Sequence, residues 1–250
     1  MKNKQFNELA VCGLEAVLAL GEKNPGKIRR LYFTKERAKI LGKICKSIAA
    51  NHGIYNMVKE PEELQKLSGT PHHQGVVAMI RQETLPQADK DYIENIRNFP
   101  RIILVLDRIS NANNLGAIIR SAAFFGIKDI IISNEDGQSP VSTSTYRIAK
   151  GGMEYVSVKS VFSIPWFLEQ AGKNLPVIGT DLRGKDTPLD MKNIVSKFRG
   201  CVLVLGNEEN GISQDVRSTC SMLVKITGKT DMESLNVAQA ASILMYILTA

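Results

Sequence analysis

The sequence lacks long apolar runs and is poor in cysteine and histidine, and each shortage excludes a class of protein. No stretch reaches the roughly 18 consecutive apolar residues of a membrane-spanning helix. The polar N-terminus also lacks the apolar core of a secretory signal. The four cysteines (Cys12, Cys45, Cys201 and Cys220) and three histidines show no zinc-ligand spacing. We therefore expect a cytoplasmic protein with reduced, mostly buried cysteines, no membrane contact and no metal.

Two nucleotide-binding motifs are missing as well. The chain contains neither the G-x-G-x-x-G of dinucleotide-binding folds nor the G-x-x-x-x-G-K-[ST] of a P-loop. An enzyme acting on sugars or nucleotides on a doubly wound fold therefore stays a weak alternative.

Positive charge is present in excess, and it is unevenly distributed. The formal net charge is +7, and residues 1–85 contain 14 Lys and Arg against 8 Asp and Glu, whereas residues 86–250 contain 18 against 17. Between Lys23 and Lys46 the only acidic residue is Glu36. A polyanionic partner and a solvated helix face both fit such a stretch, and its single sign favours the partner. The candidate contacts are Arg29, Arg30, Lys35 and Lys39.

Hydrophobic periodicity predicts a small α/β domain over residues 1–82. The expected helices cover residues 7–20, 34–50 and 61–69, and the expected strands cover residues 28–33, 54–58 and 75–80. Residues 83–100, in which Pro86 precedes a charged stretch, are predicted to be a linker, with a helical turn at residues 92–96 as an alternative.

Strands and helices alternate from residue 101 to residue 250, and this alternation predicts a mostly parallel sheet covered by helices. Strands are expected at residues 102–106, 129–133, 155–161, 176–181, 201–206 and 222–227. Helices are expected at residues 115–125, 143–150, 165–172, 191–198, 213–220 and 234–248.

Three polar segments, at residues 107–122, 205–213 and 226–237, follow or overlap the ends of predicted strands of this second domain. Each one taken alone is compatible with ordinary helix capping or an ordinary turn. Ligands of open α/β sheets bind beyond the carboxyl ends of the strands. Three loops rich in Asn, Gly and Glu at that edge therefore predict a small-molecule site.

Together the three segments resemble the motifs of the SpoU/TrmH family of RNA ribose 2′-O-methyltransferases, within the knotted SPOUT superfamily. The matching residues are Asn114, Gly116 and Arg120 in the first motif, Gly206, Glu208 and Gly211 in the second, and Ser234, Leu235, Asn236 and Val237 in the third. Residues 12–17 and 73–78 are similar to the beginning and end of the family's substrate-binding domain. The resemblance implies a trefoil-knotted methyltransferase core preceded by a small ribosomal-protein-like α/β domain.

The resemblance also implies an activity, a cofactor and partners. A methyl group would pass from S-adenosylmethionine to a ribose 2′-hydroxyl of RNA, ribosomal RNA being favoured over transfer RNA, in a homodimer whose two catalytic domains contribute to each site. The catalytic candidates are Asn114, Arg120, Glu208, Ser234 and Asn236. The cofactor-binding candidates are Gly179, Thr180, Gly206, Ile226 and Leu235.

Arg120 is the implied centre of the chemistry, but a guanidinium is a poor general base because its pKa is about 12 or higher. We expect it instead to grip an RNA phosphate and to stabilise the forming alkoxide. Asn114 would position the ribose or the arginine, and Glu208 would anchor either of them. Ser234 and Asn236 would complete the hydrogen bonding around the hydroxyl and the amino-acid end of the cofactor.

The sequence departs from the family pattern at two loop positions. Asn111-Ala112 stands where the first motif usually has Asp-Pro, and Thr227 stands where the third usually has proline. A non-catalytic RNA-binding protein with a degraded cofactor site is therefore a second interpretation. The retention of all five catalytic candidates favours the enzyme.

Overall fold

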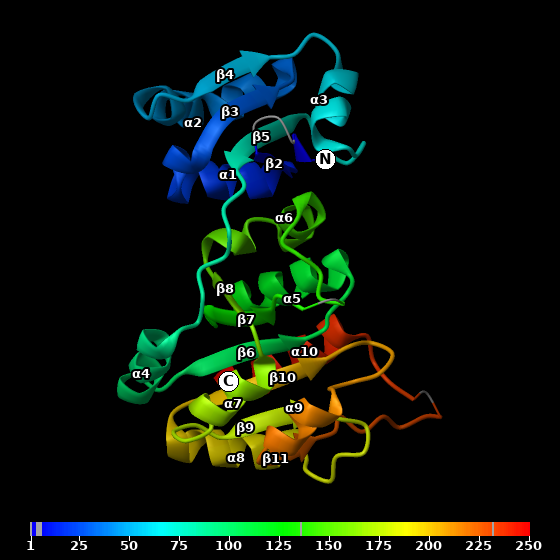
Figure 1. Ribbon diagram of the computed structural model, residues 1–250. Coiled ribbons are helices and arrows are strands. Elements are labelled where there is room, and N and C mark those ends of the chain that lie inside the picture. Colours follow the sequence, from blue (N-terminus) through cyan, green and yellow to red (C-terminus); the bar gives the residue numbers. More distant parts are fainter. Residues whose placement is uncertain (1, 4–6, 136, 232) are drawn as a thin grey trace. The chain divides into compact units, whose positions relative to one another are not determined.

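The computed structural model describes residues 2–3, 7–135, 137–231 and 233–250. The chain divides into two compact units (Figure 1), the first made of Met1–Thr84 with Val141–Tyr155 and the second of Leu85–Pro140 with Val156–Ala250. Among the described residues, no helix is long and apolar enough to cross a membrane.

The first unit is a five-stranded sheet in the order β1-β2-β5-β3-β4, antiparallel except for the parallel pair β3 and β4. Its strands are β1 (Lys2–Asn3), β2 (Glu8–Cys12), β3 (Ile28–Phe33), β4 (Ile54–Met57) and β5 (Val76–Arg81). Its helices are α1 (Leu14–Lys23), α2 (Ala38–Ala50), α3 (Pro61–Ser68) and α6 (Thr143–Ala149), with short 3-10 turns at Pro25–Lys27, Lys35–Arg37 and Gly152–Glu154.

Alternate residues of these strands build a core on each face of the sheet. Leu31 and Ala78 face the apolar residues of α1 and α2, whereas Val77 and Met79 face Leu64 of α3. Tyr146 of α6 is buried in the first of these cores. This burial explains why residues 141–155, expected within the domain 101–250, pack with the first unit.

The helix predicted over residues 7–20 is wrong in its first half. Residues Glu8–Cys12 form strand β2, whose five residues are all buried and pair antiparallel with β5. Gly13, at a φ of +96° that favours glycine, turns the chain into α1. Because both faces of β2 are covered, its sequence is a continuous buried run without the alternation that marks a half-exposed strand.

The second unit contains the predicted parallel sheet, six strands in the order β11-β9-β10-β6-β7-β8. Its strands are β6 (Ile102–Asp107), β7 (Asp129–Ser133), β8 (Ser157–Val161), β9 (Val177–Thr180), β10 (Cys201–Gly206) and β11 (Met222–Val224). Its helices are α4 (Lys90–Asn98), α5 (Ala112–Phe124), α7 (Ile164–Ala171), α8 (Pro188–Phe198), α9 (Gln214–Thr219) and α10 (Val237–Thr249). Helices α5, α8 and α10 pack together, as do α4, α7 and α9.

The order of the strands reverses between β6 and β10. On one side of this point lie β6, β7 and the edge strand β8. On the other side lie β10, β9 and the edge strand β11, in that spatial order. Asp107 and Gly206, the last residues of the two central strands, are register partners. The loops that follow them diverge from a common point, which is where ligands bind in open α/β sheets.

The segment 83–100, predicted as a linker, is largely part of the second unit. Ala88 N donates to Ser160 O over 3.0 Å, so the segment runs along the edge strand β8. Helix α4 follows, and its Tyr92 hydroxyl donates to Asp129 over 2.8 Å, while Ile96 is fully buried. The helical alternative at residues 92–96 is confirmed and extends to nine residues.

Candidate active site

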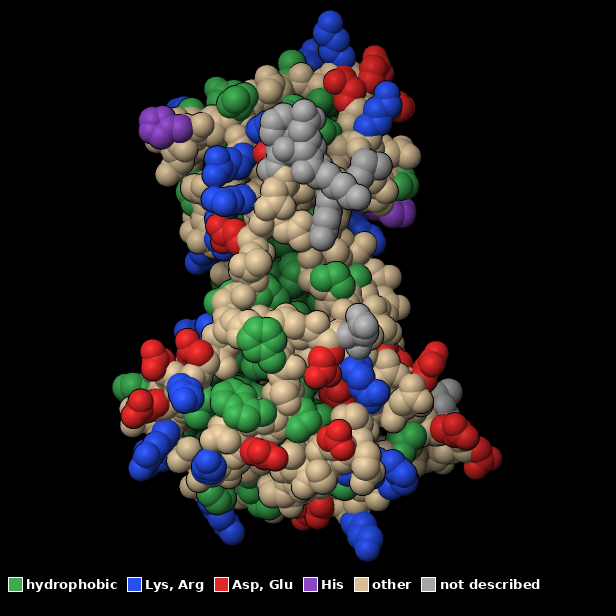
Figure 2. Space-filling model, in the orientation of Figure 1, with side chains coloured by type: hydrophobic (Ala, Val, Ile, Leu, Met, Phe, Trp, Pro, Cys, Tyr) green, Lys and Arg blue, Asp and Glu red, His purple; other side chains and the backbone are tan. Residues whose placement is uncertain are grey.

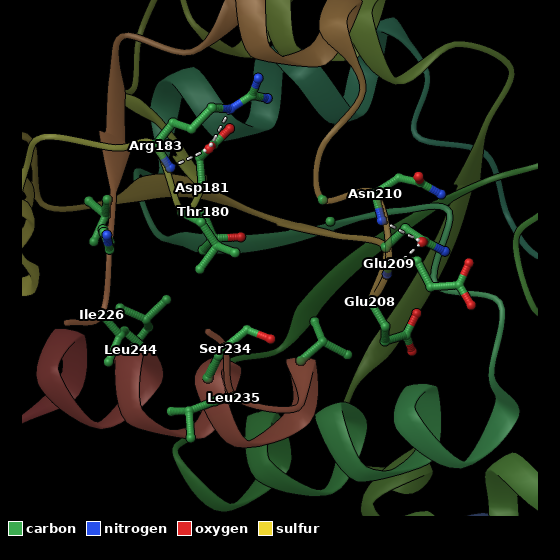
Figure 3. Close-up of a pocket in the computed structure, with 18 of the residues that line it drawn as sticks. Thr180, Asp181, Arg183, Glu208, Glu209, Asn210, Ile226, Ser234, Leu235 and Leu244 are labelled. Carbon is green, nitrogen blue, oxygen red and sulfur yellow. Dashed lines mark hydrogen bonds and ion pairs between the residues drawn. The ribbon is translucent and has the colours of Figure 1, made fainter. Parts of the chain in front are cut away.

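A pocket of about 240 Å³ lies at the carboxyl edge of the sheet of the second unit. Its walls are the residues that follow β9, β10 and β11, together with the beginning of α10 (Figure 3). The apolar lining comprises Leu182, Val224, Ile226, Leu235, Val237, Ala240 and Leu244. The charged lining comprises Asp181, Arg183, Glu208, Glu209, Arg217 and Lys225. The predicted small-molecule site therefore has a cavity at the expected edge of the sheet.

Four of the five cofactor-binding candidates line this pocket: Thr180, Gly206, Ile226 and Leu235. Gly179 lies outside the lining, and a Cβ on it would be 2.8 Å from Ile212 Cδ1 and from Cys220 Sγ. Gly179 thus permits close packing under α9. The hydroxyl of Thr180 donates to Val204 O over 3.1 Å, so it joins β9 to β10.

The loop after β10 is shaped by Gly206 and Asn207. A Cβ on Gly206 would lie 2.2 Å from the carbonyl carbon of Gly211, so only glycine lets the loop fold back on the strand. Asn207 Oδ1 accepts from Glu209 N over 2.9 Å, and Asn207 Nδ2 donates to Arg108 O over 2.9 Å. Asn207 had no predicted role, although an asparagine directly after a buried strand is a signal for such a turn.

Three of the catalytic candidates form one hydrogen-bonded chain. Asn114 Nδ2 donates to Glu208 Oε1 in a short contact, and Asn236 Nδ2 donates to Asn114 Oδ1 over 3.1 Å. Asn114 belongs to α5, Glu208 belongs to the loop after β10, and Asn236 is the cap of α10. All three motifs therefore meet here. Because the amide of Asn114 is bound at both ends, its orientation is fixed.

Two members of this chain, Asn114 and Asn236, lie at the N-termini of α5 and α10. Asn111 caps α5 by accepting from Asn113 N over 2.8 Å, and Asn236 caps α10 by accepting from Ala238 N over 2.9 Å. A helix N-terminus carries about half a positive charge, which favours anions nearby. The Asn111-Ala112 departure therefore leaves the start of α5 capped. Thr227, the other departure, is exposed and lies outside the pocket lining.

The remaining two catalytic candidates are placed differently. Ser234 is exposed and lines the pocket. Arg120 is exposed on α5 and makes no hydrogen bond or ion pair with any residue that the structure describes. Six residues along a helix amount to a rotation of about 240°, so Arg120 lies about 120° around α5 from Asn114.

Asp107 connects the first motif to the second, a role that the motif match did not assign. Its carboxylate is buried and accepts from Ser213 N over 2.6 Å, and it pairs with Arg108 Nε at 3.2 Å. Arg108 has a φ of +58°, an unusual value for a non-glycine residue. Asp107 and Asn207 therefore both hold the chain where β6 ends.

The cysteines do not offer a nucleophile. Burial raises the pKa of the Cys12 thiol to about 11, and it raises the pKa of the Cys201 and Cys220 thiols to about 12. Burial raises the pKa of Cys45 as well. Because the thiolate is the reactive form, these groups are unreactive at neutral pH.

The candidate RNA contacts lie in the first unit. Arg29, Lys35 and Lys39 are exposed, whereas Arg30 pairs with the buried carboxylate of Glu8. This ion pair and a hydrogen bond to Tyr32 raise the pKa of Arg30. On the visible face of the second unit, acidic and basic side chains are interspersed (Figure 2).

Helix α2 continues the basic surface. Lys39, Lys43 and Lys46 are exposed at helical spacing, and they lie opposite the buried face that comprises Leu41, Ile44, Cys45 and Ile48.

Comparisons with known proteins agree with both units. Residues 101–246 match the SpoU rRNA Methylase family, and residues 10–86 match the RNA 2′-O ribose methyltransferase substrate binding family. The chain is 32% identical over 239 residues to the 23S rRNA (guanosine-2′-O-)-methyltransferase RlmB of Acinetobacter baylyi, covering 94% of each chain. It is 29% identical over 248 residues to an uncharacterised tRNA/rRNA methyltransferase of Haemophilus influenzae, covering 98% of this chain and 67% of the relative.

The fold is also that of solved methyltransferases. The SpoU methyltransferase AviRb from Streptomyces viridochromogenes, in complex with AdoMet, superposes with a TM-score of 0.76 at 23% identity, covering 100% of this chain and 93% of the other. An AdoMet-bound rRNA methyltransferase from Sinorhizobium meliloti superposes equally well at 22% identity, covering 98% and 87%. The resemblance read from the three motifs is confirmed, and the chain belongs to the SpoU rRNA methylase family of S-adenosylmethionine-dependent RNA ribose 2′-O-methyltransferases.

Proposed function

We propose that this chain methylates the ribose 2′-hydroxyl of a guanosine in ribosomal RNA, with the pocket of the second unit as its cofactor site. The observation that carries the proposal is the hydrogen-bonded chain Glu208–Asn114–Asn236, which joins all three motifs beside the pocket. The nucleotide and the RNA follow from similarity to the guanosine-specific relatives.

The pocket residues fit S-adenosylmethionine. Ile226, Leu235 and Leu244 offer an apolar surface suited to an adenine ring, and the carboxylates of Glu208 and Glu209 suit a cation such as a sulfonium. When bound, the cofactor supplies an electrophilic methyl group. The two departures from the family pattern leave this lining intact.

The residues around the hydrogen-bonded chain can stabilise negative charge. A ribose hydroxyl becomes nucleophilic as its proton leaves, and the oxygen then needs preorganised positive partners. The N-termini of α5 and α10 provide such a field next to Asn114 and Asn236. Glu208 holds the Asn114 amide in place, so this amide does not have to reorient during the reaction. Ser234 lines the pocket and can add its hydroxyl as a further hydrogen-bond donor.

We propose that Arg120 acts at the active site of a second copy of the chain, within a homodimer. Arg120 and Phe124 are four residues apart on one side of α5, and Phe124 is 83% exposed. Tyr246 of the adjoining α10 is 60% exposed, and its ring lies 6.2 Å from that of Phe125. Such an exposed aromatic surface is typical of a protein interface. A partner docked on it would bring its own site toward Arg120.

We further propose that the first unit, with residues 1–82, binds the RNA substrate and that the second unit carries the chemistry. Residues 83–100 connect the two and pack largely with the second unit. The exposed Arg29, Lys35 and Lys39 and the lysines of α2 supply the positive surface for phosphates. Arg30 is the weakest of the four candidates because Glu8 already neutralises it.

Two finer features complete the proposal. We propose a trefoil-knotted core for the second unit, as the resemblance to the SpoU/TrmH family implies. We also propose that the chain acts on RNA in the cytoplasm.

Methylation of RNA from cells that lack the gene tests the proposed function. The purified chain, incubated with S-adenosylmethionine and this RNA, should protect one ribosomal guanosine from alkaline cleavage at its 3′ side. Asn114→Ala should abolish the protection. RNA binding without methylation, and without binding of S-adenosylhomocysteine, would identify a non-catalytic RNA-binding protein instead.

A further inference from the structure

Asp181 is a nearly buried acid in the pocket wall, across the pocket from Glu208 and Glu209 (Figure 3). It is the first residue after β9, it belongs to none of the three motifs, and its side chain is only 5% exposed. Its carboxylate accepts from Arg183 N over 2.7 Å and forms an ion pair with Arg217 of α9. A charge this far from water has to be matched by its partners.

The charge of Arg217 is balanced by the same ion pair with Asp181. The side chain of Arg217 is 16% exposed, it lines the pocket, and its Nε is buried without a hydrogen-bond partner among the residues that the structure describes. The other acids of the pocket, Glu208 and Glu209, lie on the opposite wall. Removing Asp181 would leave Arg217 as an unmatched charge in a largely buried position. Removing Arg217 would leave Asp181 with only the exposed Arg183, whose Nε lies 3.4 Å from its carboxylate.

Asp181 also shapes the backbone of the wall. Asp181 O accepts from Gly184 N over 2.9 Å, and with the bond from Arg183 N this closes a turn over residues 181–184. Asp181 N donates to Val224 O over 3.1 Å, so the turn is held against β11. Because residues Thr180 to Arg183 line the pocket, the position of this wall follows from where Asp181 is held.

We propose that the Asp181–Arg217 ion pair positions the wall of the cofactor site and thereby sets the affinity for S-adenosylmethionine. Arg217 acts through Asp181, and neither residue takes part in the chemistry at the ribose. The inference rests on the proposed assignment of this pocket to the cofactor. It adds to the motif residues a pair from outside the motifs, one from the end of β9 and one from α9.

Calorimetry with S-adenosylhomocysteine on the full chain tests the pair. Asp181→Asn keeps an oxygen for Arg183 N but removes the charge, and Arg217→Met removes the charge while keeping much of the volume. Each should weaken binding about tenfold or more, as expected for a broken and partly buried pair. The KM for S-adenosylmethionine should rise in step, while the methylation rate at saturating donor falls far less. Arg217→Lys, which retains the charge, should recover most of the affinity.

Two further variants separate positioning from folding. Arg97→Met, the same substitution at an exposed arginine of α4, should leave the affinity unchanged. The double variant Asp181→Asn with Arg217→Met has no unmatched charge, so it should bind no more weakly than either single variant. Single variants that melt earlier but bind S-adenosylhomocysteine with parental affinity would overturn the proposal, as would fully additive losses.

The assignment of the pocket needs its own control. Ala240→Leu adds bulk to the pocket lining from α10 and should strongly reduce binding. Parental affinity in Ala240→Leu would refute the pocket as the cofactor site and the inference with it. Lost affinity in Ala240→Leu together with parental affinity in the Asp181 and Arg217 variants would refute only the role of the ion pair.

Discussion

Asn236 donates a hydrogen bond from its side-chain amide to Asn114 Oδ1 over 3.1 Å, although 122 positions separate the two residues in the chain. The same Asn236 side chain caps α10 through its oxygen. One residue thus links the start of the last helix to the helix that carries the first motif. A substitution at Asn236 can therefore remove the hydrogen bond to Asn114 and keep the cap of α10.

Asn236→Ser should retain the cap of α10, because a serine oxygen also accepts from the backbone at this position. It removes the amide that donates to Asn114, which leaves the orientation of Asn114 less restricted. We expect a single-turnover methylation rate lower by about ten- to a hundredfold, in the range of other lost active-site donors or somewhat smaller. Asn236→Ala loses the cap as well, and should also cost about 1 kcal/mol of unfolding free energy. An unchanged rate in Asn236→Ser would show that the link to Asn114 is dispensable.

Arg120→Ala should affect the chemistry and not the fold. The side chain is exposed and has no partner among the described residues, so the melting temperature and the affinity for S-adenosylhomocysteine should stay near the parental values. If the guanidinium stabilises the alkoxide, the single-turnover rate should fall by roughly two orders of magnitude or more, about 3 kcal/mol. Arg120→Lys should recover only part of the rate because it lacks the planar fork that suits a phosphate. A folded Arg120→Ala protein that methylates at the parental rate contradicts this role.

Replacement of Arg29, Lys35 and Lys39 by alanine should weaken binding to all RNAs. Each lost phosphate contact should lower the salt dependence of the affinity by about 0.7–0.9 in the log–log slope. Filter binding at several salt concentrations measures both effects. The matched control replaces Lys128, Lys173 and Lys197, three exposed lysines of the second unit, with the same change of net charge. Equal losses of RNA affinity in the two triple variants would show that only the net charge of the protein matters, and not the position of these residues.

Arg30→Ala should behave differently from its neighbours, because Glu8 is buried and would lose its ion-pair partner. We expect a loss of unfolding free energy of about 1–3 kcal/mol, since a buried carboxylate without its partner is costly and Arg30 is itself partly exposed. Chemical denaturation of the purified chain measures this loss. The double variant Arg30→Met with Glu8→Gln should restore part of it. Parental stability in Arg30→Ala would show that the ion pair with Glu8 does not stabilise the fold, and Arg30 would again be a candidate RNA contact.

Much of the fold was predictable because its signals are local. The parallel sheet was expected from buried runs such as residues 201–206 and from their alternation with helices, and β10 covers the predicted residues. The helix at Pro61–Ser68 was expected from a proline in its first turn and a glycine at its end. The motif residues were recognised one by one from spacing and order along the chain.

The errors share one physical cause, which is that burial depends on neighbours distant in the sequence. Glu8–Cys12 became a strand because β5 and two cores cover it, and no local period indicates such a covering. Residues 90–98 became a helix of the second unit because Tyr92 and Ile96 find partners there. In the same way Arg30, counted as a free cation in the sequence, is neutralised by a carboxylate on another strand.

The amino-acid sequence by itself determined the family, the chemistry and the residues at the carboxyl edge of the sheet, since motif spacing and residue type are carried along the chain. Only the tertiary structure decided which of these residues touch. It joined Asn114, Glu208 and Asn236, and it paired Asp181 with Arg217. Contacts of this kind depend on how helices rotate and where strands end in space, and pairwise distances between remote segments are not encoded in any local pattern.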